Sequence, residues 1–165
     1  MKITRIAAVL LSTALPILAC ATTSFDAFKK EVLSAHNQYR ATHHASKLEW
    51  DDTLSNYAQR YASQCRFEHS HGPYGENLAT GYPSLHAAMQ AWYNEKKLYS
   101  HSNPQFAKTT GHFTQLVWKS TTKIGCGYVA CNGLHGTPGN YLVCEYNPPG
   151  NVVNAGYFRE NVLPG

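Results

Sequence analysis

Five cysteines, and where they lie, set the strongest limit on what this chain of 165 residues can fold into. Cys20 lies in an apolar N-terminal stretch, whereas Cys65, Cys126, Cys131 and Cys144 lie in the body of the chain. An even number of cysteines in a secreted chain is typical of disulfide bonds. A zinc ribbon would need two closely spaced pairs, and only Cys126 and Cys131 are close together. The four cysteines allow three different sets of two disulfide bonds, and their spacing does not choose among them. Cys126 and Cys144 fall on two neighbouring predicted strands. If these two are bonded, Cys65 is left to bond with Cys131.

The apolar stretch Ile6 to Ala19 follows two basic residues near the start of the chain. It is too short to span a bilayer with margin and ends in small residues, which is typical of a secretory signal peptide cleaved after about Ala21. We therefore expect a signal peptide over residues 1–21 and one secreted, extracellular domain over residues 22–165, with no stable membrane anchor. A membrane anchor helix and a lipoprotein lipidated on Cys20 are the alternatives.

Charged side chains make up only 15% of the chain, against about 25% in ordinary globular proteins, and aromatic ones make up 12%. This composition excludes a highly charged disordered protein and a coiled coil. Loss of the signal peptide removes two of the 14 basic side chains and none of the 10 acidic ones. No basic stripe is left, so a nucleic-acid partner is not expected.

Apolar residues at steps of three and four predict three helices. The first runs from about Phe25 to His43, the second is capped by Asp52 and ends near Cys65, and the third is capped by Ser84. Residues 70–83 read as a crossing rich in glycine and proline, residues 100–111 read as a long loop, and residues 113–117 suit one or two helical turns. Two strands, Lys123–Val129 and Tyr141–Tyr146, flank a glycine-rich hairpin loop. Helices followed by strands around one core predict an α+β layered domain.

Two of the nine histidines have surroundings that suit chemistry. His69 opens a segment that holds a carboxylate, Glu76, seven residues later, and His112 comes just before a short apolar helix. Nothing in the local pattern brings these two side chains together. Most other histidines are expected to be structural or solvated, and His36 is expected to be a packed polar group on the first helix.

Four segments carry a resemblance to a known family. They are GHFTQLVW (residues 111–118), YLVCEYNPPGNV (141–152), His69-Ser70 with GENLA (75–79), and AWYNE (91–95). In this order and spacing they resemble the CAP superfamily of cysteine-rich secretory, antigen and pathogenesis-related class 1 proteins. The chain is most similar to its fungal secreted sterol-binding branch, over roughly residues 28–151. Glu145 departs from the plant relatives, which have asparagine there.

The resemblance implies a three-layer α-β-α sandwich with a central antiparallel sheet. It implies the disulfides Cys65–Cys131 and Cys126–Cys144, and an open cleft that contains two histidines and two glutamates. Carried over by position, these cleft residues are His69, Glu76, Glu95 and His112.

In some relatives the two cleft histidines bind a divalent ion, often zinc. Here His69 and His112 would be the metal ligands, while Glu76 and Glu95 would orient the rings or hold water. Two protein ligands are too few for a closed structural site, so such an ion would be weakly held. The alternative is a hydrogen-bonded polar cluster that holds the cleft together without metal.

An aromatic loop contacts the sterol in the branch that the chain resembles, and residues 99–106 match it. Tyr99 and Phe106 occupy two of its three aromatic positions, His101 replaces the middle aromatic residue, and Pro104 lies in the turn between them. These four residues are the predicted lipid-binding set. Without the resemblance, Tyr99 and Phe106 would be read as packing the loop onto the core.

The resemblance thus favours a secreted protein, not an enzyme, that binds and exports sterols and also takes fatty acids in a separate groove. One alternative is a metal-dependent hydrolase or protease in the same His/Glu cleft, although the chain has no His-Glu-x-x-His and no Gly-x-Ser-x-Gly. Another is the precursor of a C-terminal signalling peptide that begins near Pro148 and includes Gly150 and Asn151.

Overall fold

A computed structural model describes the backbone from Ile17 to Gly165 and the side chains from Ser24 onward. Most of the predicted signal peptide, residues 1–16, lies outside the described residues, so its cleavage stays a prediction. In the part of the chain that the structure describes, no helix is both long and apolar enough to cross a membrane.

The predicted helices and strands are present, and two further strands join them. The helices are α1 (Ile17–Thr42), α2 (Asp52–Ala62), α3 (Leu85–Asn94), α4 (Gly111–Val117) and α5 (Tyr157–Asn161), with short 3₁₀ helices η1 (Glu95–Leu98) and η2 (Leu134–Gly136). The strands are β1 (Glu49–Trp50), β2 (Gly75–Thr80), β3 (Lys123–Ala130) and β4 (Asn140–Asn147). Helix α1 begins earlier than predicted, and the sequence pattern did not indicate β1, β2 or α5.

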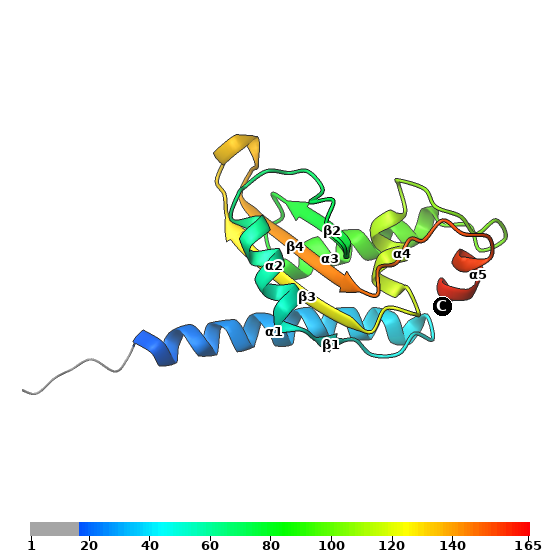
Figure 1. Ribbon diagram of the computed structural model, residues 1–165, viewed down its shortest axis with the longest axis horizontal. Helices are drawn as coiled ribbons and strands as arrows, with labels where there is room; N and C mark the ends of the chain where they lie inside the picture. The colour runs from blue at the N-terminus through cyan, green and yellow to red at the C-terminus, as the bar shows by residue number, and fades with distance from the viewer. Residues whose placement is uncertain (1–16) are drawn as a thin grey trace, which may run out of the picture.

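The four strands form one sheet in the order β1-β3-β4-β2. β4 pairs antiparallel with β3, as the predicted hairpin requires, and it also pairs antiparallel with β2. The short edge strand β1 pairs parallel with β3, so the sheet is mixed. In Figure 1, α2 lies in front of the sheet, α3 and α4 lie behind it, and α1 runs along its length. This arrangement confirms the three-layer α-β-α sandwich.

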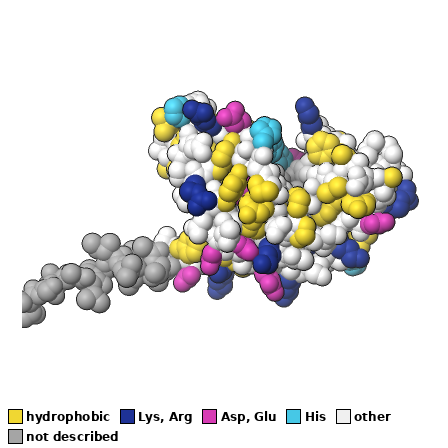
Figure 2. Space-filling model, viewed as in Figure 1, with side chains coloured by type: hydrophobic (Ala, Val, Ile, Leu, Met, Phe, Trp, Pro, Cys, Tyr) yellow, Lys and Arg dark blue, Asp and Glu magenta, His cyan; other side chains and the backbone are white. Residues whose placement is uncertain are grey.

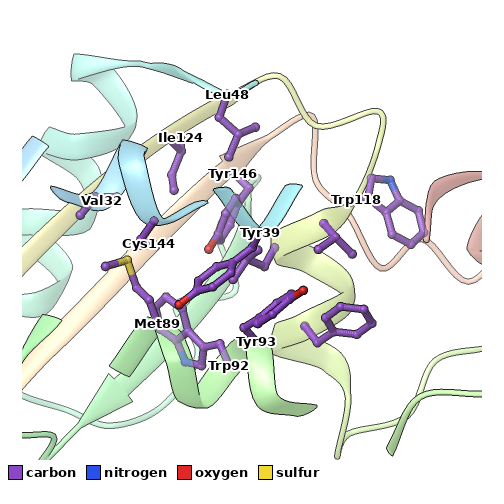
Figure 3. Packing of buried hydrophobic residues seen from close by; sticks show 14 of the residues in the cluster. Val32, Tyr39, Leu48, Met89, Trp92, Tyr93, Trp118, Ile124, Cys144 and Tyr146 are labelled. Atoms are coloured by element: carbon purple, nitrogen blue, oxygen red, sulfur yellow. The ribbon is translucent and has the colours of Figure 1, made fainter. Parts of the chain in front are cut away.

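Alternating side chains of β4 divide the core between the two faces of the sheet. Leu142, Cys144 and Tyr146 point toward α1, α3 and α4, and together with Trp92 they form the larger cluster shown in Figure 3. Val143 points to the other face, in a smaller cluster with α2. Because successive strand residues face opposite sides, one buried strand serves both layers.

Two glycines of β3 let α2 lie directly on the sheet. A Cβ atom on Gly125 would come within 2.2 Å of the Ser55 backbone nitrogen, and one on Gly127 within 2.4 Å of the Gln59 backbone. Any larger residue at either position would force the helix and the strand apart.

The beginnings of α2 and α3 test the predicted caps. Ser84 caps α3, with its hydroxyl accepting from the Ala87 N–H at 3.1 Å, as predicted. For α2 the prediction was wrong by one residue, because Asp51, not Asp52, accepts from the N–H groups of Thr53 and Leu54. Asp51 has the extended backbone that a cap requires, whereas Asp52 is already helical.

Strand β2 forms within the segment that its glycine and proline content marked as irregular. All six of its residues, Gly75–Thr80, pair in register with Tyr141–Tyr146 of β4. The Trp92 indole N–H of α3 also donates to the Leu78 carbonyl at 3.1 Å. These contacts with distant parts of the chain outweigh the weak local propensity of the segment.

The guanidinium of Arg40 fixes the position of α4 relative to α1. The side chain is fully buried and donates to the carbonyls of Ser46, Leu116, Trp118 and Thr121 at 2.8–3.1 Å. Burial lowers the pKa of Arg40 to about 10, so it still carries its charge at neutral pH. Four carbonyl acceptors thus take the place of a carboxylate partner.

Both disulfides implied by the resemblance are present, Cys65–Cys131 and Cys126–Cys144. The first joins the end of α2 to the connection between β3 and β4, across 66 residues of sequence.

We expect the double variant Cys65→Ala/Cys131→Ala to lose about 4 kcal/mol of unfolding free energy, because the unfolded chain regains the freedom of a long loop. Urea unfolding of the oxidised proteins measures this loss, and a loss below about 1 kcal/mol would contradict it.

Candidate functional site

His69 is held by a carboxylate from the edge strand of the sheet. Its Nδ1 lies 2.7 Å from Oε1 of Glu76 on β2, and the Ser70 N–H also donates to this carboxylate, at 3.0 Å. Burial opposes ionisation of Glu76, but the hydrogen bonds from His69 and Ser70 outweigh it and leave the pKa of Glu76 below its usual range. The same hydrogen bond from His69 to Glu76 raises the pKa of His69.

His112 is held in the same way from a different part of the chain. It lies in the first turn of α4, and its Nδ1 is 2.6 Å from Oε1 of Glu95, the first residue of η1. The backbone N–H groups of His112 and Phe113 donate to Oε2 of Glu95, at 3.0 and 3.2 Å. Trp92 stacks on the imidazole, with the ring centroids 6.0 Å apart. Each histidine therefore has a glutamate on Nδ1.

The two histidines face one cleft. A cavity of about 400 Å³ is lined by His69, Glu76, Phe106, Lys108 and His112, among others. A second cavity, of about 300 Å³, adjoins it and shares His69, Glu76 and Phe106. Glu95 lies behind His112. The structure thus brings the predicted cleft residues together, and Figure 2 shows a hollow beside a histidine side chain on the face in view.

The chemistry of these donors suits a weakly held divalent ion. A carboxylate on Nδ1 fixes the tautomer of each imidazole and leaves Nε2, the usual metal-ligating atom, without that proton. Within the described residues, no three or more histidine, cysteine, aspartate or glutamate side chains are arranged to hold a metal. An ion bound between them would have His69 and His112 as its two protein ligands, and solvent would fill the remaining positions.

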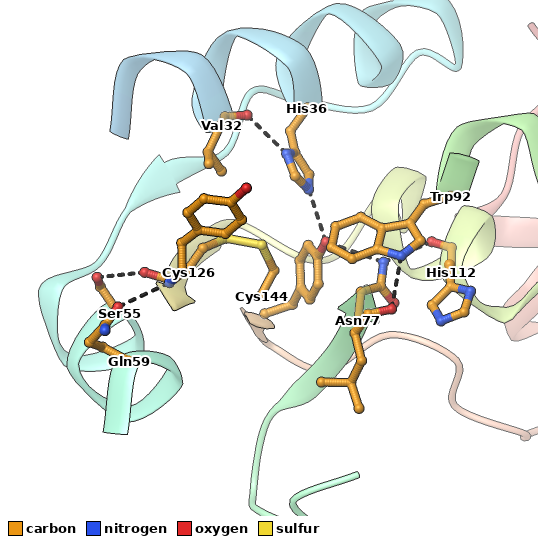
Figure 4. The surroundings of a disulfide bond; sticks show 12 residues. Val32, His36, Ser55, Gln59, Asn77, Trp92, His112, Cys126 and Cys144 are labelled. Carbon is orange, nitrogen blue, oxygen red and sulfur yellow. Dashed lines mark hydrogen bonds between the residues drawn. A yellow bond between two sulfur atoms is a disulfide. The ribbon is translucent and has the colours of Figure 1, made fainter. Parts of the chain in front are cut away.

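A chain of hydrogen bonds runs from α1 through the core to the cleft (Figure 4). His36 Nδ1 donates to the Val32 carbonyl at 2.9 Å, and its Nε2 accepts from the Tyr146 hydroxyl at 2.9 Å. The Asn77 amide donates to the Tyr146 hydroxyl at 3.3 Å and to the His112 carbonyl at 3.0 Å. Burial lowers the pKa of His36 to about 4, so this histidine is a neutral, packed group, as predicted.

The segment after β4 closes one side of the cleft through two side chains, Gln115 and Asn151, that were not among the predicted cleft residues. Gln115 Oε1 accepts from the Gly150 N–H at 2.8 Å. Asn151 donates to the Gly111 carbonyl at 2.9 Å and accepts from the Thr114 hydroxyl. Gln115 lies within GHFTQLVW and Asn151 within YLVCEYNPPGNV, so their place in the two strongest motifs was the available signal.

The predicted lipid-binding loop divides between the core and the cleft. Tyr99 packs 5.7 Å from the Phe113 ring, and His101 lies 4.9 Å from Tyr99. Phe106 lines both cavities and is 44% exposed, with its ring 3.3 Å from where a Cβ atom on Gly111 would lie. Pro104 is half-buried between these positions. Phe106 therefore lies at the cleft, whereas Tyr99 and His101 do not line it.

Comparison with known proteins identifies relatives of this chain. A family model described as the cysteine-rich secretory protein family, CAP, matches residues 33–146. Protein PRY2 of Saccharomyces cerevisiae is 46% identical over 142 residues, which cover 83% of this chain and 41% of PRY2. Secreted protein RBT4 of Candida albicans is 46% identical over 148 residues, which cover 82% of this chain and 40% of RBT4. The chain therefore spans about two fifths of the length of each of these curated relatives.

A solved structure described as NaASP2 with Zn²⁺ has the same fold. It matches with a TM-score of 0.61 and 26% identity, over 74% of this chain and 80% of that one. The family description and the name of RBT4 both denote secreted proteins, which agrees with the predicted secretion of this chain.

The buried His36 makes stability fall in acid. Its pKa is about 4 in the folded protein and about 6.5 in the unfolded chain, so the unfolded chain binds the extra proton. The neutral, buried state of His36 contributes fully to the unfolding free energy above about pH 6.5. This contribution, about 3 kcal/mol at most, is lost as the pH falls toward 4. We expect the difference in unfolding free energy between wild type and His36→Gln to shrink across this range. Urea unfolding at several pH values measures this difference, and a constant difference would contradict the assignment.

Proposed function

The chain belongs to the cysteine-rich secretory protein (CAP) family, and on this premise we propose that it is a secreted protein that binds sterols and carries them outside the cell. The proposal concerns only the ligand of this CAP domain. Fatty acids, which the resemblance also implies, are the second ligand class.

The observation that carries the proposal is an apolar side chain exposed at the rim of the cleft. Phe106, which lines both cavities, presents 44% of its surface, and Val153, which lines the smaller cavity, presents 75%. An apolar ligand that covered these side chains would gain about 25 cal/mol for each Å² removed from water. Exposed apolar groups around a hollow are typical of a ligand-binding surface.

A buried hydroxyl in the same loop suits a ligand with one polar group. The Tyr99 hydroxyl is buried and has no hydrogen-bond partner among the described residues. A sterol combines a large apolar body with a single hydroxyl; because Tyr99 does not line the cleft, pairing of that hydroxyl with Tyr99 would require the loop to move. An unpaired buried hydroxyl costs about 1–3 kcal/mol, so this pairing would favour the bound form.

The cleft would add a metal to this function. A divalent ion such as zinc would be held by Nε2 of His69 and His112, where it would supply a fixed positive charge. Zn²⁺ is named in the description of the related NaASP2 structure. Glu76 and Glu95 would keep the two rings oriented through their bonds to Nδ1.

A titration of the secreted protein with a radiolabelled sterol tests the proposal. We expect saturable binding, and we expect Phe106→Ala to weaken it about tenfold because part of the apolar contact is lost. Leu134→Ala is the matched control, since Leu134 is also exposed (54%) but lies on η2, away from the cleft. Absence of saturable binding by the folded protein, or an equal loss in both variants, would contradict the proposal.

The variant His112→Ala separates sterol binding from the hydrolase alternative. If the loop binds sterol, this variant should retain saturable sterol binding. Hydrolysis of a peptide or ester substrate by the wild-type protein that disappears in His112→Ala would favour the hydrolase instead.

A further inference from the structure

Glu145 is a buried carboxyl group that the cleft described above does not use. It lies on β4, directly opposite Glu76 on β2 in the strand register, and its other neighbour across the sheet is Gly125 of β3. It faces α2, which lies directly on Gly125, and only 1% of its surface is exposed. The two glutamates are thus direct neighbours across the strands, and Oε1 of Glu145 has no hydrogen-bond partner in the described part of the chain.

Two neighbouring carboxyl groups can hydrogen-bond to each other only when one of them carries a proton. Two buried carboxylates in contact would repel each other, so one stays neutral. Glu76 already accepts from the imidazole of His69 and the N–H of Ser70, and both bonds stabilise its ionised form. Glu145 receives no comparable donor. Burial and the charge of Glu76 together raise the pKa of Glu145 to about 9, which agrees with a proton on Glu145.

The hydrogen bonds to Glu95, in the half of the cleft that holds His112, can be compared with those to Glu76. Glu95 is fixed on one oxygen by His112 Nδ1 and on the other by two backbone N–H groups, those of His112 and Phe113. Glu76 has a backbone donor from Ser70 alone. The O–H of a neutral Glu145 would be the counterpart of the second backbone N–H that Glu95 receives.

We propose that Glu145 is a positioning residue, a neutral carboxylic acid whose O–H holds the Glu76 carboxylate in the orientation that binds His69. Through Glu76 it keeps the proton of the neutral imidazole on Nδ1 and leaves Nε2 directed into the cleft. Glu145 itself touches neither the cavity nor a ligand. This role concerns the cleft alone, so it does not depend on sterol binding.

Nitrogen NMR of the histidine rings tests the role in metal-free protein at alkaline pH. We expect His69 to carry its proton on Nδ1 in the wild type. Glu145→Gln, which keeps a donor but cannot ionise, should retain that tautomer. Glu145→Met, of similar length but without a donor, should shift His69 toward the Nε2–H form. His112 is the internal control and should stay unchanged in all three proteins, because backbone groups hold Glu95.

Two results would overturn the proposal. One is a Glu145→Met protein in which His69 keeps the wild-type tautomer. The other is a Glu145→Gln protein that loses the tautomer as fully as Glu145→Met, which would show that shape or charge matters rather than donation.

A second measurement does not depend on the folding of any variant. In wild-type protein labelled with ¹³C, the carboxyl carbon of Glu145 should have the chemical shift of a neutral acid at pH 7. An ionised Glu145 at that pH would overturn the proposal. A failed sterol titration would leave both NMR results as they are, so the two hypotheses fail separately.

Discussion

The amide of Asn77 joins the two halves of the cleft, and much of the site depends on it. Asn77 follows Glu76 on β2, so it belongs to the half that holds His69, and it donates to the carbonyl of His112 in the other half. Its contact with the Tyr146 hydroxyl extends this link to His36 on α1. Buried polar groups that are fully paired in this way specify one arrangement of the core.

The cleft therefore combines a rigid base with an exposed rim. Arg40 ties the end of α4 to α1, and glutamates hold both imidazoles, so the polar groups are fixed before any ligand arrives. Phe106 at the rim instead presents apolar surface to solvent. A fixed polar site beneath an exposed apolar loop suits a protein that receives and releases an apolar ligand without changing it.

Local sequence rules predicted the elements whose signals are local. The periodic apolar residues of α2 and α3, and the cap at Ser84, follow from helix geometry alone. Strand β2 was missed because it exists through pairing with β4, more than sixty residues away in sequence. The resemblance placed His69 and His112 in one cleft, which no local pattern could do. No local pattern could place Glu145 opposite Glu76, because that pairing depends on register across two strands.

The central claim is that His69 and His112 present Nε2 to one shared cavity. X-ray diffraction at the zinc absorption edge, from crystals soaked in Zn²⁺, tests this claim most directly. We expect one anomalous peak within about 2.0–2.1 Å of Nε2 of both imidazoles, with Glu76 and Glu95 still on the Nδ1 atoms. A zinc ion bound to only one imidazole, or to an Nδ1 atom, or two imidazoles in separate cavities, would contradict it.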